Sequence, residues 1–339
     1  MSHDVLSEVL RNVRLRGAAY YHVNGGQDWV AEAHAAREVA AIVLPGSEHV
    51  LEYHVVTHGS CWGGIIGEPP VHLQTGDILM FPHGDAHVMS SAPGMRAPTG
   101  GPGAVERSPD QLPFNLRLSG VQGTGELSDE AVCTTLICGF LGCDVRPFNP
   151  LIAALPRLLH LRSSGQSGWI VQLMQNAVSE SLAKRPGGEA MLERLSEMMF
   201  VDAMRRYADT LPEGSSGWFA GLRDRLLGRA LAFMHDDPAA DWSVDELGRR
   251  VGLSRSALHQ RFVDTIGLAP MQYLASWRMQ LAASLLRNTS ATIAAVAQEV
   301  GYASEAAFSR AFRRLLGMPP SAWRRASMGN GHGAITTPA

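Results

Sequence analysis

The sequence predicts an α+β chain with a small β-barrel first, helices after it, and an all-α C-terminal domain that contains two helix-turn-helix units. Three observations carry this prediction. Short apolar runs separated by Gly, Pro and other turn residues fill residues 17–148, which is typical of a barrel or sandwich. Apolar residues at helical spacing replace these runs after residue 149. The pattern of segment 242–267 then recurs at 292–317.

Composition excludes several other classes of protein. Of the 339 residues, 45% are hydrophobic and 18% are charged, as in a globular protein of about two domains. No apolar run approaches the ~18 residues of a membrane-spanning helix, and residues 1–17 lack the apolar core of a secretory signal. Four cysteines are too few for a disulfide scaffold. We therefore expect a cytoplasmic protein that contacts no membrane.

The net charge of −3 is unevenly distributed along the chain. Residues 222–325 hold 14 Arg and 9 acidic residues, a net +5, whereas residues 1–221 hold 15 basic and 23 acidic residues, a net −8. A basic C-terminal part fused to an acidic N-terminal part fits a nucleic-acid-binding module joined to a sensor.

The first domain is predicted over residues 1–148 from short apolar runs between turn signals. The runs are VAAIVL (39–44), EYHVVTH (52–58), GGIIG (63–67), DILMFP (77–82), FNLRLSGV (114–121) and AVCTTLICGFLG (131–142).

A helical region is predicted over residues 149–209. Amphipathic stretches cover 167–185 and 189–207, with the breaker RPGG between them. Their apolar stripes fit a helix pair packed on the barrel or a dimer seam, and both can hold at once, so a homodimer is an open alternative. Residues 210–220, which begin TLPEGSSG, predict an interdomain linker.

The C-terminal domain is predicted over residues 221–326, followed by a disordered tail at 327–339. Its expected helices lie near 222–235, 243–251, 254–266, 270–288, 292–300, 304–316 and after Pro319-Pro320.

Two segments of this domain share the signals of a helix-turn-helix. In each, a glycine ends the first helix and a serine caps the second: Gly252 with Ser254, and Gly301 with Ser304. Two apolar side chains four residues apart then hold the second helix against the first. These pairs are Leu258 with Phe262 and Phe308 with Phe312. This geometry places a recognition helix in the DNA major groove.

The tandem arrangement over 222–325, and above all the segment GYASEAAFSRAFRRLLGMPPSAWR, resembles the AraC/XylS family of transcription regulators. The resemblance implies that one subunit places both recognition helices in successive major grooves, about 34 Å apart. It also implies double-stranded DNA and RNA polymerase as partners, and activation as the commoner mode of action.

The exposed N-terminal positions of each recognition helix are expected to face DNA. Arg310 suits guanine and Gln260 suits adenine by donor and acceptor geometry. Glu305 could accept from cytosine or stabilise the helix dipole instead. Arg261, Arg313 and Arg314 are expected at phosphates, although a solvated face is the alternative for Arg313 and Arg314. The full set of predicted DNA-binding residues is Arg255, Ser256, His259, Gln260, Arg261, Glu305, Ala306, Ser309, Arg310, Arg313 and Arg314.

The N-terminal segment GDILMFPHGDAHVM has the spacing G-x5-P-x-G-x2-H, which resembles the second motif of cupin barrels. The upstream segment EYHVVTHGSCWGGI keeps a Glu, two His and Gly59 but lacks the H-x-H pair of the first cupin motif. With the NPLIAALPRLLHL run, the order of motifs resembles the cupin-type sensor domain of one branch of AraC-type regulators. No cofactor is required by this reading, but a metal bound in the barrel stays open. The candidate effector or metal ligands are His54, His58, Cys61 and His87.

Three classes of function follow. The first is a DNA-binding regulator, expected to activate transcription, whose cupin domain senses a small molecule or an oxidant and has no catalytic residues. The second is a metal-dependent cupin enzyme fused to a DNA-binding domain. The third is a thiol switch that uses Cys61, Cys133 or Cys138. Apolar neighbours predict inert core thiols at Cys133 and Cys138, which leaves Cys61 as the more reactive one.

Overall fold

The computed structural model describes residues 4–97, 114–120, 127–163, 168–183 and 186–329. It divides into two compact units. The sheet unit consists of Leu15–Cys143 and Leu155–Asp209. The helical unit consists of the N-terminal residues to Arg14, Asp144–Ala154, and the chain from Thr210 onward. None of the described helices is both long and apolar enough to cross a membrane.

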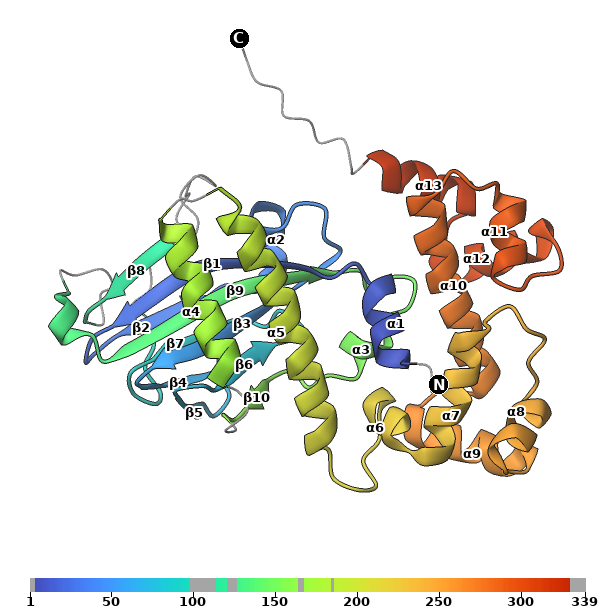
Figure 1. Cartoon of the computed structure of the whole chain (residues 1–339), viewed down its shortest axis with the longest axis horizontal. Helices are drawn as coiled ribbons and strands as arrows, with labels where there is room; N and C mark the ends of the chain where they lie inside the picture. The colour runs from blue at the N-terminus through green and yellow to red at the C-terminus, as the bar shows by residue number, and fades with distance from the viewer. Residues whose placement is uncertain (1–3, 98–113, 121–126, 164–167, 184–185, 330–339) are drawn as a thin grey trace, which may run out of the picture. The chain divides into compact units, whose positions relative to one another are not determined.

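The sheet unit contains two β-sheets. This confirms the predicted α+β class with a cupin-like β-domain at the N-terminus. The six-stranded sheet has the order β10-β6-β3-β9-β1-β8, and the four-stranded sheet has the order β2-β7-β4-β5 (Figure 1). Every pairing is antiparallel except that of β1 with β8. The strands are β1 (Arg16–Gly25), β2 (Val30–Ala33), β3 (His49–His58), β4 (Ser60–Ile65), β5 (Val71–Gln74), β6 (Ile78–Phe81), β7 (His87–Ser90), β8 (Phe114–Leu118), β9 (Thr134–Cys143) and β10 (Leu159–Leu161).

Residues from both sheets share one apolar core. Leu73 and Met89 come from the four-stranded sheet, and Leu79, Phe81 and Leu136 come from the six-stranded sheet. The turn from β3 into β4 depends on Gly59, which has φ +74°. A Cβ at this position would lie 2.0 Å from the carbonyl oxygen of Cys133, so only glycine fits.

One predicted strand is wrong. The run VAAIVL overlaps helix α2 (Ala36–Val43) instead of forming a strand. Its apolar residues are alanines and branched residues without strict alternation, so the run does not distinguish a short helix from a buried strand. The helix buries Ala36 and Val43 against a satellite core that also contains Val50 and Phe140.

Helices α4 (Gly168–Leu182) and α5 (Gly188–Thr210) run side by side across one face of the sheets (Figure 1). Gly17 of β1 permits the close approach of α5, because a Cβ there would meet the carbonyl oxygen of Glu193 at 2.4 Å. The buried hydroxyls of Tyr53 and Ser196 are 2.6 Å apart and link β3 to α5. The helix pair therefore packs on the barrel, which is one of its two predicted roles.

The helical unit also contains two segments that come before its predicted start at residue 221 in the sequence. These are α1 (Val5–Asn12) and the stretch containing α3 (Pro150–Ala153). Asp144 is buried and bonds the guanidinium groups of both Arg14 and Arg287. The Gln280 side chain donates to the Asn12 carbonyl over 2.9 Å. The predicted barrel range 1–148 therefore includes residues that cluster with the helical unit.

The remaining helices follow the predicted sequence order. They are α6 (Trp218–Arg223), α7 (Arg225–Asp236), α8 (Val244–Val251), α9 (Arg255–Ile266), α10 (Pro270–Asn288), α11 (Ile293–Glu299), α12 (Glu305–Leu316) and α13 (Pro320–Gly329). The range 210–220 that we predicted as a linker includes the start of α6. The predicted disordered tail is wrong for residues 327–329, which belong to α13, and residues 330–339 lie outside the described part of the chain.

Helix α10 joins two helix-turn-helix units, α8–α9 and α11–α12 (Figure 1). The predicted caps are present: the Ser254 hydroxyl accepts from the Ala257 amide, and the Ser304 hydroxyl accepts from the Ala307 amide. Gly252 and Gly301 have φ of +83° and +80°, which permits the sharp turn between the helices of each unit.

Candidate DNA interface and barrel interior

Each recognition helix buries one face and exposes the other. Leu258 and Phe262 of α9, and Phe308 and Phe312 of α12, are completely buried. The predicted DNA-binding residues lie on the exposed faces, apart from Ser309, which is half-buried. The fold therefore presents two exposed polar helix faces, one in each helix-turn-helix unit.

Several of these side chains already have partners within the protein. The Gln260 amide donates to Asp264 over 2.7 Å. The Arg261 guanidinium bonds Asp224, the N-cap of α7. Burial alone would raise the pKa of Asp224, but backbone amide donors and Arg261 outweigh it and lower the pKa below its usual value. Arg261 thus ties α9 to α7, in addition to the phosphate contact predicted for it.

The arginines of α12 are arranged differently. Arg310, Arg313 and Arg314 are exposed and have no carboxylate partner within the described part of the chain. In α9, by contrast, Arg255 reaches Asp245 and Arg261 reaches Asp224. The face of α12 therefore offers more uncompensated positive charge to a phosphate backbone than the face of α9.

A second candidate site lies inside the barrel. Glu52 and His54 are two residues apart in β3, so their side chains share one face of the strand. His87 reaches the same point from β7 in the other sheet. One ligand atom from each residue lies within 4.8 Å of the other two, and all three residues are buried.

Hydrogen bonds orient the cluster. The two imidazole Nε2 atoms of His54 and His87 are 2.7 Å apart, and Nε2 of His87 is 3.6 Å from Oε2 of Glu52. Nδ1 of His87 lies 2.9 Å from the Asp85 carbonyl oxygen and must donate its proton to it, which leaves Nε2 of His87 as an electron-pair donor. The Phe81 ring stacks on the His87 ring at 3.8 Å and fixes its plane.

Burial opposes charge on all three groups. It raises the pKa of Glu52 to about 8, lowers the pKa of His87 to about 4, and lowers the pKa of His54 well below its usual value. The neighbouring His87 also lowers the pKa of His54. Oε1 of Glu52 and Nδ1 of His54 are buried without a hydrogen-bond partner in the described structure. Neutral imidazoles beside a buried carboxyl with an unsatisfied oxygen fit the ligand set of a divalent transition metal ion.

The predicted ligand set is only partly brought together. His54 and His87 meet, but His58 is exposed at the end of β3, and Cys61 is not among the three clustered ligand groups. Glu52 is not among the candidate ligands predicted from the sequence, although it lies in the segment that resembles the first cupin motif. Its i, i+2 spacing from His54 in a predicted strand was the signal that could have found it.

The cysteines differ from their predicted environments. All four are free thiols. Cys133 is exposed, so its assignment as a core thiol is wrong. Cys61, the predicted reactive thiol, is buried, and burial raises its pKa to about 12. Cys138 is buried as predicted, with its pKa raised well above the usual value by burial. Because the thiolate is the reactive form, neither buried cysteine has the environment of an activated thiol.

The fold and these exposed helix faces define a DNA-binding protein of the helix-turn-helix class with an N-terminal cupin domain. A cupin family profile matches residues 4–209, and a helix-turn-helix domain profile matches residues 247–326. An AraC-like transcription regulator of Streptomyces lividans is 32% identical over 95% of this chain and 98% of its own length. The regulator AlkR of Acinetobacter baylyi is 26% identical over 96% of this chain and all of its own length.

Among solved structures, the DNA-binding domain of AdpA in complex with a target DNA is 30% identical, covers 33% of this chain and 99% of its own, and has a TM-score of 0.31. The chain belongs to the AraC-like family of transcription regulators and has a cupin domain at its N-terminus. This confirms the family and the regulatory function predicted from the sequence.

Proposed function

We propose that this regulator activates transcription in response to a divalent transition metal ion held by Glu52, His54 and His87. The observation that carries the proposal is the convergence of three buried ligand groups from two sheets within 4.8 Å. Zinc and iron ligands lie about 2.0–2.2 Å from the metal, which places neighbouring ligand atoms roughly 3 Å apart. The distances of 2.7 Å and 3.6 Å at His87 Nε2 lie on either side of that value.

The metal would supply the positive charge that this interior lacks. Bound to Nε2 of the two imidazoles and to the carboxylate, it would satisfy the Glu52 oxygen that has no partner in the described structure. The bond from His87 to the Asp85 carbonyl is the outer contact that commonly orients a histidine ligand.

We propose sensing in place of catalysis at this site. The three side chains are at most 6% exposed, so a substrate would have little access to a metal held by them. The relatives described above are named as regulators, in keeping with this choice. A metal-dependent cupin enzyme is the rival, and turnover of a small substrate by the metal-loaded chain would favour it.

Metal content of the purified full-length chain tests the proposal. After incubation with Zn²⁺ or Fe²⁺ and removal of excess, we expect about one ion per chain in the wild type. His87→Gln should lose the ion, because it removes an imidazole ligand. His58→Gln is the matched control, since His58 is an exposed histidine of the same sheet unit, and it should retain the ion. Equal metal content in His87→Gln and wild type, or none in the wild type, would contradict the proposal.

On DNA, we propose that α9 and α12 of one subunit read two unlike half-sites. Their exposed residues differ: Ser256, His259 and Gln260 on α9, against Glu305 and Arg310 on α12. As an activator, the chain would recruit RNA polymerase to the promoter in the cytoplasm. A reporter fused to a bound promoter should lose expression when the gene for this chain is deleted. A rise in expression on deletion would identify a repressor instead.

We also propose that the chain forms a homodimer through α4 and α5. Trp169 and Met198 are 44% and 48% exposed and line the same small apolar groove on these helices. Sedimentation of the wild type and of Met198→Glu should show a dimer that the charged variant weakens. A monomeric wild type at micromolar concentration would refute this assembly.

A further inference from the structure

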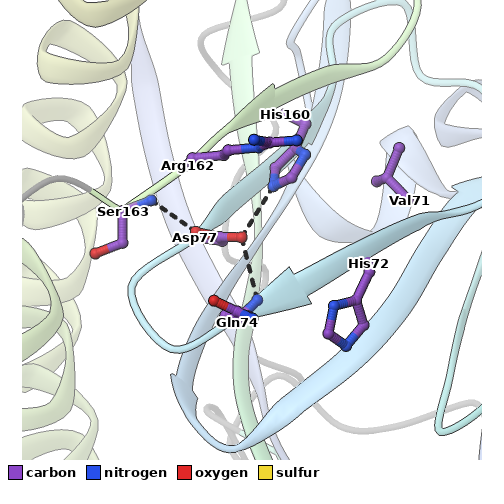
Figure 2. Close-up of a pocket in the computed structure, with 7 residues that line it drawn as sticks. All are labelled: Val71, His72, Gln74, Asp77, His160, Arg162 and Ser163. Atoms are coloured by element: carbon purple, nitrogen blue, oxygen red, sulfur yellow. Dashed lines mark hydrogen bonds and ion pairs between the residues drawn. The ribbon is translucent and has the colours of Figure 1, made fainter.

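A cavity of about 440 Å³ lies at the seam between the edge strands of the two sheets. Strand β5 ends the four-stranded sheet, and β10 ends the six-stranded sheet. Residues of both edge strands and of the segments next to them line the cavity: Val71, His72 and Gln74 of β5, Asp77 in the β5–β6 turn, His160 of β10, and Arg162 and Ser163 just beyond it (Figure 2). None of these residues belongs to the Glu52–His54–His87 cluster.

Asp77 organises the floor of this cavity. Its side chain is buried, and Oδ1 accepts the backbone amide of Ser163 over 2.6 Å. Oδ2 accepts hydrogen bonds from the backbone amide of Gln74 over 3.1 Å and from Nε2 of His160 over 2.9 Å (Figure 2). These bonds join the β5–β6 turn to the chain after β10. The floor is therefore a fixed structure and not a chance gap between loops.

Gly76 allows the two segments to lie so close. Its φ is +92°, and a Cβ there would be 2.3 Å from the Ser163 hydroxyl oxygen. A side chain at this position would push Ser163 away from Asp77 and open the floor.

Cationic and donor groups surround the floor. Arg162 is exposed, and its guanidinium has no carboxylate partner within the described residues. The bond from His160 to Asp77 fixes the orientation of that imidazole at the wall of the cavity. His72 stands on the β5 side, with its ring 4.9 Å from the Trp62 ring. Figure 2 shows Arg162 and His160 near one another and His72 on β5 of the other sheet.

We propose that this cavity binds a small monocarboxylic acid, with its carboxylate at Arg162 and its apolar body along Val71 and His72. A planar guanidinium matches a carboxylate in two parallel hydrogen bonds. The fixed negative charge of Asp77 disfavours a dianion such as phosphate, because only one permanent cation lines the cavity to balance it. A volume of about 440 Å³ lies in the range of small-molecule sites.

This inference goes beyond the proposed metal site and does not depend on it. The metal content of the chain tests the cluster of Glu52, His54 and His87, whereas titration with a carboxylate tests the seam. Each can fail while the other holds, since the two sites share no residue.

Calorimetric titration of the full-length chain with benzoate, hexanoate, inorganic phosphate and neutral benzamide tests the proposal. Saturable binding is expected for benzoate or hexanoate, and weaker binding for phosphate and benzamide. Arg162→Gln should raise the dissociation constant of the bound carboxylate about ten- to hundredfold, because it removes a charge-assisted bond. Arg37→Gln, at an exposed arginine of α2 in the same unit, is the matched control and should bind as the wild type does.

Three outcomes would overturn the assignment. One is the absence of saturable binding by both carboxylates. Another is equal affinity in Arg162→Gln and wild type. The third is tighter binding of phosphate than of either carboxylate, which would point to a general anion site. Because Arg162 is exposed, its loss leaves the fold intact, and a circular dichroism melt equal to that of Arg37→Gln checks this.

Discussion

Truncation of Phe308 to alanine tests the packing of the second helix-turn-helix unit. The side chain is completely buried in a core that also contains Val296, Phe312 and Trp323. Its ring centroid lies 5.6 Å from that of Tyr302 and 5.4 Å from that of Phe312. Phe308→Ala therefore removes a ring held on several sides and leaves a cavity that its aromatic neighbours cannot easily fill.

The expected cost is about 3–5 kcal/mol, the usual range for Phe→Ala in a core. That cost lowers the equilibrium constant for folding roughly 150- to 5,000-fold, since about 1.36 kcal/mol corresponds to a factor of ten. Because a domain is stable by only about 5–15 kcal/mol, α11 and α12 should lose most of their protection from opening.

Hydrogen exchange on the full-length chain measures this loss in the peptides that cover α11 and α12. Leu315→Ala is the control, because Leu315 lies on the same helix but is 46% exposed and should cost less than about 1 kcal/mol. Protection in Phe308→Ala within tenfold of the wild type, or equal losses in the two variants, would refute the placement of Phe308 at the centre of this core.

Three further substitutions test other parts of the helical unit. Arg310→Ala should weaken specific DNA binding by roughly 1–3 kcal/mol and relax the preference at one base position. Selection from a random DNA library measures this, and an unchanged consensus would remove Arg310 from base readout. Ser304→Ala should destabilise the start of α12 by about 0.5–2 kcal/mol, seen as faster amide exchange there. Ser256→Ala, at an exposed position that does not cap a helix, should have no such effect, and similar exchange in both variants would count against the cap. Asp144→Asn should cost roughly 3–5 kcal/mol, because it leaves the largely buried Arg287 without its carboxylate. A urea midpoint unchanged by this last substitution would show that the contact contributes little.

The DNA-binding part of the chain could be predicted because its signals are local. The serine caps, the glycines that end helices and the apolar pairs four residues apart all act within one or two helical turns. In the structure the two serines cap their helices, the two glycines have positive φ, and both apolar pairs are buried. Local signals do not predict which charged residues pair with one another. The ion pair of Arg261 with Asp224, for example, joins residues 37 positions apart.

The sheet unit was harder to predict because strands are defined by their partners. The run VAAIVL carries no alternation that separates strand from helix, and it folds as α2. Cys133 lies within the apolar run AVCTTLICGFLG of the sequence, yet β9 begins only at Thr134 and Cys133 is exposed. The exposure of Cys133 therefore depends on its position just outside β9, and the apolar composition of the surrounding sequence does not predict it.

The sequence by itself determined the order of the parts, the two helix-turn-helix units and the family resemblance, because each depends on residues that interact within a short stretch of chain. Only the tertiary structure brought His87 to Glu52 and His54, placed His160 on Asp77, and joined Arg287 to Asp144. The physical reason is that these groups meet through strand pairing and burial across 33 to 143 residues of chain. A sequence pattern shows which side chains could bind a ligand, but long-range packing decides which of them share one dry or enclosed space.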